Sequence, residues 1–157
     1  MIWLFTLASG LSMASADDAL QTRITKAFSA RDNVPSCEVV ANWGTTESVS
    51  KAMRNITETV AMPPWAPMQA AGCVAQDATA DPKSWEMVQG WMVDEKTAGF
   101  ALVVVQNVDV LDASKARVIA GLALKRAKTD ARFSRMVRNP MQASQHSAVV
   151  DLATQLP

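Results

Sequence analysis

The sequence predicts an all-α protein, and three observations favour that class. Alanine is abundant, whereas glycine is sparse, with six residues in 157, and this balance favours helices. Apolar residues recur at the helical spacing of i, i+3, i+4 and i+7 in most segments. Ser, Thr, Asp or Pro precedes several of these segments, as is typical of helix starts. We therefore expect helices and no sheet.

Residues 1–16 are predicted to be a cleaved signal peptide. The run from 2 to 13 is mostly apolar and is followed by Ala14, Ser15 and Ala16, an A-x-A cleavage pattern. No Lys or Arg precedes the run, which departs from the usual signal. The run is too short to span about 30 Å of hydrocarbon. Cleavage after Ala16 gives a periplasmic or secreted chain, residues 17–157, with one all-α domain and no transmembrane segment.

The first predicted helices follow directly. The first covers 17–28 and ends at "RDNVP", and a short one with Pro35 in its first turn carries Cys37. After "NWGTT", Thr45 or Thr46 caps a third helix that extends to Val60. The apolar positions that predict these helices are Leu20, Ile24, Ala27, Phe28, Val40, Val49, Ala52, Met53, Ile56 and Val60.

The stretch "MPPWAPMQAAGCVAQDATADP", residues 62–82, holds four prolines, a tryptophan and a cysteine. Pro63 and Pro64 end the preceding helix and are tolerated in the first turn of a new one. Trp65, Met68 and Val74 then follow at helical spacing. The stretch is therefore interpreted as the tight turn and second helix of an αα-hairpin.

Residues 84–92 predict a short helix after the start signal of Asp81 and Pro82, with Trp85, Val88 and Trp91 on one face. Residues 98–110 are ambiguous, because the run from Phe100 to Val105 also suits a buried strand. We favour a helix, since the chain offers no partner strand to satisfy the hydrogen bonds of an isolated one.

The last third predicts three helices, over 112–127, 129–140 and 141–156. Asp112 or Ser114 caps the first, and Asn139 and Pro140 are expected to stop the second. Their apolar faces comprise Val118, Ile119, Leu122 and Ala123 in the first, Phe133, Met136 and Val137 in the second, and Val149, Leu152, Ala153 and Leu156 in the third.

The helices share a format of helix, tight turn and helix rich in small residues. Residues 110–127, "VLDASKARVIAGLALKRA", resemble the second helix of a HEAT-type repeat, with an Asp-containing turn, the pair Arg117 and Val118, and then Ala and Leu at helical spacing. The resemblance implies stacked antiparallel hairpins, a HEAT-like α-solenoid fragment that serves as a protein-binding surface. It covers 129–156 loosely and the first half poorly. The helix near 85–91 would then be an insertion, and an irregular helical bundle is the alternative fold.

Two cysteines in an exported chain predict one disulfide between Cys37 and Cys73. A regular stack of hairpins would keep the two cysteines too far apart to form it. The two residues would be offset by roughly 10 Å along parallel helices, whereas bridged Cα atoms lie within about 7 Å. Whether the disulfide forms therefore bears on the regularity of the stack.

We expect no catalytic residue, metal site or cofactor. His146, the only histidine, has Ser144 and Ser147 beside it and Asp151 five positions on. A spacing of five does not place side chains together on a helix, and a triad also needs an oxyanion hole. No phosphate loop, metal-ligand cluster or nucleophile elbow is present. A small envelope enzyme, or an accessory subunit with an unrecognised site, is the alternative function.

The charges predict the kind of partner. The chain has 15 basic and 15 acidic residues, a balance that argues against nucleic acid. Residues 17–111 hold 7 basic and 12 acidic residues, and 112–157 hold 8 and 3. The candidate partner-binding residues are Lys125, Arg126, Lys128, Arg132, Arg135 and Arg138. Their partner is expected to be an acidic protein, an anionic envelope surface or the acidic end of another copy. We therefore predict an exported, non-enzymatic interaction or structural module.

The tryptophans are expected to cover the ends of the core. An alternative groups Trp85 and Trp91 with Met87 and Met92 as an exposed binding patch.

Overall fold

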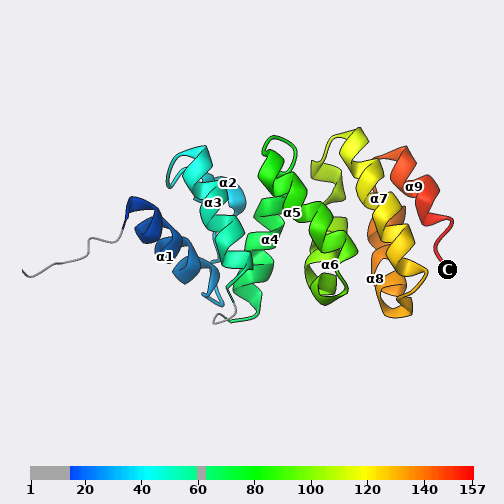
Figure 1. Cartoon of the computed structure of the whole chain (residues 1–157), viewed down its shortest axis with the longest axis horizontal. Helices are drawn as coiled ribbons and strands as arrows, with labels where there is room; N and C mark the ends of the chain where they lie inside the picture. The colour runs from blue at the N-terminus through cyan, green and yellow to red at the C-terminus, as the bar shows by residue number, and fades with distance from the viewer. Residues whose placement is uncertain (1–14, 60–62) are drawn as a thin grey trace, which may run out of the picture.

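The computed structural model describes residues 15–59 and 63–157, and these residues are helical without any strand. Figure 1 shows the helices following one another along the long axis of the molecule. They are α1 (Ala16–Phe28), α2 (Cys37–Ala41), α3 (Thr46–Thr57), α4 (Trp65–Asp77), α5 (Pro82–Val93), the 3₁₀ helix η1 (Glu95–Thr97), α6 (Ala98–Gln106), the 3₁₀ helix η2 (Val108–Val110), α7 (Ala113–Ala127), α8 (Ala131–Gln142) and α9 (Ser147–Ala153). The all-α prediction is confirmed.

The first helices begin at capping side chains. The predicted signal peptide lies outside the described residues except for Ser15 and Ala16, and the Ser15 hydroxyl caps α1 at Asp18 N. Thr45 caps α3, as one of the two predicted alternatives had it. The predicted end of this helix at Val60 lies outside the described residues, and α3 itself ends at Thr57.

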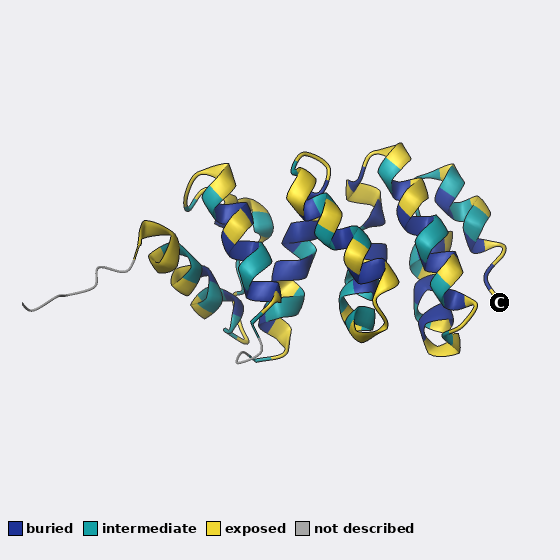
Figure 2. Cartoon of the chain, in the orientation of Figure 1, coloured by how far each residue is buried: buried dark blue, intermediate teal, exposed yellow. Residues whose placement is uncertain are grey.

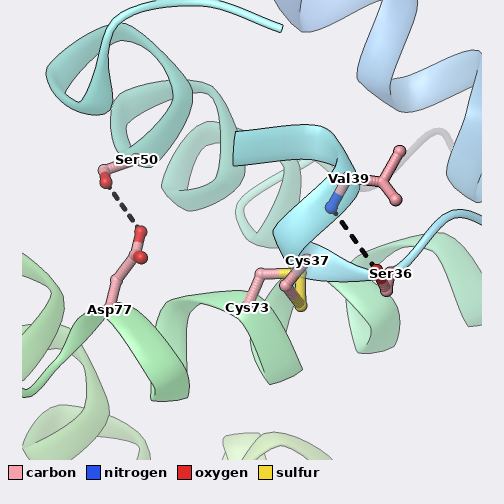
Figure 3. The surroundings of a disulfide bond; sticks show 6 residues. All are labelled: Ser36, Cys37, Val39, Ser50, Cys73 and Asp77. Carbon is pink, nitrogen blue, oxygen red and sulfur yellow. Dashed lines mark hydrogen bonds between the residues drawn. A yellow bond between two sulfur atoms is a disulfide. The ribbon is translucent and has the colours of Figure 1, made fainter. Parts of the chain in front are cut away.

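The disulfide between Cys37 and Cys73 is present, with the Cα atoms 5.3 Å apart. The predicted offset does not arise, because α2 has only five residues and is too short to act as a full second helix. Figure 3 shows its first turn lying against α4, where the two sulfurs meet. The disulfide therefore fastens a short helix onto α4 and does not join two long parallel helices.

α4 starts directly after the prolines, as predicted, and packs against α3. Pro64 stands at its N-cap position without a side-chain cap. Its inward side consists mainly of small residues, and Ala66, Ala70, Ala71 and Ala75 have no exposed surface. Small side chains let neighbouring helices approach closely, and α1, α3, α5 and α6 all contact α4.

Two predictions concern the middle of the chain, the helix or strand at residues 98–110 and the short helix that became α5. Residues 98–106 form α6, so the helical interpretation is confirmed over the strand. α5 is a full helix of 12 residues that packs against α4, α6 and α7. The interpretation of this segment as an insertion stays a prediction, although α5 contacts its neighbours as the other helices do.

The last three helices differ from prediction at particular positions. In α7, Ile119 and Ala123 are buried, but Val118 is 41% exposed and does not belong to the core face. α8 continues through Pro140 to Gln142. Proline near the last turn removes one N–H donor from the helix, and the helix tolerates that loss. α9 starts at Ser147 and not at the predicted residue 141.

Packing contacts are local along the chain. Most contacts from α3 onward join helices one or two places apart, such as α4 with α6, α6 with α8, α5 with α7 and α7 with α9, and α4 also contacts α1. Figure 2 shows the buried residues lying between neighbouring helices along the whole length of the molecule. The core is therefore an extended layer and not a central ball.

Removing the disulfide should destabilise the fold without changing its helices. On the chain-entropy estimate, a link across 36 positions contributes about 3–4 kcal/mol. We expect Cys37→Ala/Cys73→Ala to lose about that much unfolding free energy in urea titrations. Reduced wild-type protein is the matched control and should behave like the variant. An unchanged unfolding midpoint in both would contradict the disulfide's role.

Candidate functional site

A polar cluster joins α3, α4 and the start of α5. Ser50 of α3 donates a hydrogen bond to Asp77 Oδ2 of α4 over 2.6 Å, as Figure 3 shows. One turn later in α3, Arg54 forms an ion pair with Asp81 and also donates to Ser84 Oγ at 3.2 Å. Hydroxyl, guanidinium and carboxylate groups from three helices therefore meet in one place.

The local sequence explains this meeting. Ser50 and Arg54 are four residues apart and so lie on one side of α3. Asp77 ends α4, and Asp81 caps α5 by accepting from Ser84 N at 3.0 Å. The turn of four residues between these helices, 78–81, brings the two carboxylates to the same end of α3.

The two aspartates titrate in opposite directions. Burial raises the pKa of Asp77 above its ordinary value and outweighs the hydrogen bond from Ser50. Partial burial also acts to raise the pKa of Asp81, but the hydrogen bonds from Ser84 and the charge of Arg54 prevail and lower it. Asp77 is therefore the easier of the two to protonate.

A cavity of about 390 Å³ opens beside this cluster and is lined by Thr46, Glu47, Ser50, Arg54, Asp77, Ala80, Asp81 and Lys83. Asp77 could hold or release a proton there, and Arg54 is already neutralised by Asp81. No motif in the sequence predicted this cluster. The sequence feature that could have indicated it is the pair of polar residues Ser50 and Arg54 at the edges of the apolar face of α3.

The groups around His146 do not form a catalytic triad. His146 stands at the N-cap position of α9, and its Nε2 lies 3.0 Å from Leu111 O. Ser144 Oγ donates to Asp109 at 2.5 Å. Among the described side chains, Asp151 makes no hydrogen bond to the imidazole. His146 and Ser144 therefore connect the end of η2 to the start of α9.

The six basic candidate residues fall into two groups. Lys125, Lys128, Arg132 and Arg135 are exposed, and within residues 15–59 and 63–157 no carboxylate lies within ion-pair distance of them. Arg126 and Arg138 are partly buried and bind backbone carbonyls. The exposed four, which we call the basic patch, lie on α7, the following turn and α8.

Arg126 holds the end of α5 in place. Its guanidinium donates to Trp91 O and Asp94 O at 3.1 Å and to Glu95 O at 3.0 Å, and lies 5.0 Å from the Phe133 ring centroid. A cation at the carboxyl end of a helix is stabilising. The Arg126 guanidinium is therefore engaged in contacts within the chain and is a poor candidate for binding a partner.

Arg138 has a similar role near the last helix. Its guanidinium donates to Pro157 O at 2.6 Å, and Ser134 Oγ donates to the same oxygen at 3.0 Å. Charge reversal at Arg126 or Arg138 would therefore test folding rather than binding.

The exposed tryptophan–methionine patch is not formed. Trp91 and Met92 are buried, and Trp85 and Met87 are half-buried against the core. Trp91 packs on Phe100 with ring centroids 4.9 Å apart. Trp43, Trp85 and Trp91 pack in or against the core, as expected of core covers, whereas Trp65 is 38% exposed.

Two further properties concern the described part of the chain alone. No group of three or more His, Cys, Asp or Glu side chains is placed to hold a metal ion. None of its helices combines the length and the apolar character needed to cross a bilayer.

Comparisons with known proteins give no match. No protein-family model fits the chain, and no curated protein or solved structure is similar to it beyond the level expected by chance.

The two aspartates should give opposite pH dependences of stability. Folding raises the pKa of Asp77, so the advantage of wild type over Asp77→Asn should decline as pH rises through that pKa. Folding lowers the pKa of Asp81, so the advantage over Asp81→Asn should be present above its ordinary pKa and disappear as pH falls through the lowered one. Urea unfolding between about pH 3 and pH 8 measures both. Two differences that change in the same direction would contradict this assignment.

Proposed function

We propose that the chain is an exported HEAT-like helical-repeat protein that serves as a protein–protein interaction or structural module. The observation that carries the proposal is the locality of packing, with α4, α6 and α8 in one row and α5, α7 and α9 in the other. Stacked helical hairpins contact mainly their neighbours and present long continuous faces. Such faces suit the binding of another macromolecule.

The first helices fit a stack of hairpins less well than α7 does. The short α2 departs from a regular hairpin, and an irregular helical bundle is the alternative fold for the domain. In α7, Asp112 caps the helix at Lys115 N, 2.9 Å away, and the spaced alanines are buried. These features support the HEAT-like interpretation more than Arg117 and Val118, which face solvent.

Export is proposed on two grounds. The pattern of residues 1–16 suits a signal peptide cleaved after Ala16. The disulfide between Cys37 and Cys73 suits an oxidising compartment such as the periplasm or the extracellular space.

The partner is proposed to be acidic. The basic patch consists of exposed side chains without a carboxylate partner in the described structure. Complementary charge accelerates association and selects partners. An acidic protein fits this patch, and an anionic envelope surface is the other class of partner that shares its chemistry.

A second candidate function is a small envelope enzyme or enzyme accessory. The cavity beside Asp77 favours it, because a carboxyl group with a raised pKa beside a cavity lined by charged and hydroxyl-bearing residues suits proton transfer. The two functions separate readily. An activity that requires Asp77 but not the basic patch would favour the enzyme.

Reversing exposed charge should weaken binding to an acidic protein partner. We expect Arg132→Glu/Arg135→Glu to retain at least about tenfold less of that partner in pull-downs from the envelope fraction. Rising salt should lower wild-type binding more steeply than binding by the variant.

Lys26→Glu/Lys96→Glu is the matched control, since both lysines are exposed and the net charge changes equally. Binding proteins that all three chains retain equally, with equal salt dependence, would contradict an acidic partner at this surface. Circular dichroism melting curves confirm that the variants fold.

A further inference from the structure

Two neighbouring helices present an outward face without charge. The exposed positions are Trp65, Gln69 and Gln76 on α4 and Gly99 and Gln106 on α6, with half-buried Gly72, Leu102 and Val103 between them. These two stripes, together the uncharged face, adjoin one another. A Cβ placed on Gly72 would lie 3.9 Å from Val103 Cγ1, and one on Gly99 would lie 3.5 Å from Met68 Cε.

The absence of charge is unusual for this chain. Among the 22 residues of α4 and α6, the one charged side chain is Asp77, and its carboxylate accepts from Ser50 of α3. The other row is charged on its outward positions, with Lys83 and Glu86 on α5 and Arg117 and Lys125 on α7. Solvent-facing helix positions are normally rich in charge, so the difference marks the α4–α6 side.

The composition of the uncharged face suits a protein contact. The centres of protein interfaces are depleted in charged residues and enriched in aromatic residues and methionine. Trp65 is 38% exposed, and Met68 is half-buried beside it. The glutamine amides can donate to and accept from the backbone of a bound segment.

Exposed arginines lie beside Trp65 and on α8, the helix that packs against α6. At the α4 border, the Arg31 guanidinium lies 5.6 Å from the Trp65 ring centroid. Beyond α6 comes α8, the next helix of the same row, with exposed Arg132 and Arg135. No carboxylate in the described residues pairs with these three arginines.

We propose that the uncharged face is the docking site for a segment of a different protein, with carboxylates on that segment meeting Arg132 and Arg135. This inference rests on the proposed function and names the surface that performs it. A second copy is a poorer occupant. Two copies paired through their uncharged faces would bring Arg31, Arg132 and Arg135 of one copy towards the same arginines of the other, which is electrostatically unfavourable.

Site-specific photo-crosslinking tests the proposal. The photoreactive residue p-benzoylphenylalanine replaces Gln69 or Gln106 on the uncharged face, and Glu86 or Arg117 on the opposite row as matched controls. Cells that produce the chain are irradiated, and adducts are mapped by mass spectrometry. We expect one adduct of the same mass from Gln69 and Gln106, none from the controls, and attachment to a segment rich in Asp or Glu.

The arginines provide the second arm. Adding Arg132→Glu/Arg135→Glu should lower the adduct yield by at least roughly fivefold, and adding Lys26→Glu/Lys96→Glu should leave it unchanged. Adducts that link two copies of this chain, a segment without acidic residues, or no adduct from Gln69 and Gln106 would each overturn the proposal. Adducts from Glu86 and Arg117 alone would overturn this site while leaving the proposed function intact. No adduct at any position, together with no retained protein in the pull-downs, would overturn both.

Discussion

The close packing around α4 is the constraint on which the rest of the structure depends. Its inward alanines at positions 66, 70, 71 and 75, and Ala78 directly after it, expose no surface. The helices α1, α3, α5 and α6 all lie against it. Larger side chains there would push these neighbours apart. The same packing sets the position of Cys73 for the disulfide and that of Asp77 for the polar cluster. It also leaves the outer side of α4 free beside α6.

The basic side chains of this molecule have two roles: some bind backbone carbonyls of neighbouring helices, and others are exposed to solvent. Lys115 donates to Ala78 O and Thr79 O at 2.8 and 2.6 Å, and Arg126 does the same for the end of α5. Cations at the carboxyl ends of helices satisfy carbonyls that the helix itself cannot. Some basic residues of the carboxyl-terminal third, such as Lys115 and Arg126, therefore hold neighbouring helices together. The exposed remainder, at Lys125, Lys128, Arg132 and Arg135, is what a partner could meet.

Sequence reasoning succeeded where the cause was local. Helical spacing, the Thr45 cap and the two prolines before α4 each act within one turn, so the sequence alone predicts them. It failed where distant elements decide. The polar cluster joins residues 27 positions apart, and the role of Arg126 depends on where α5 ends. The uncharged face was also missed, because it appears only when α4 and α6 are known to be neighbours.

We propose that each helix packs mainly against its neighbours along the chain. The two rows of helices then present long faces and do not enclose one central core. Native-state hydrogen exchange tests this proposal most directly. Ile119→Val, a buried change in α7 that costs about 0.5–1.5 kcal/mol, should lower the opening free energies of amides in α7, α8 and α9. Amides in α1 and α3 should keep their wild-type values. An equal decrease in every helix would contradict local packing and would favour a single cooperative bundle.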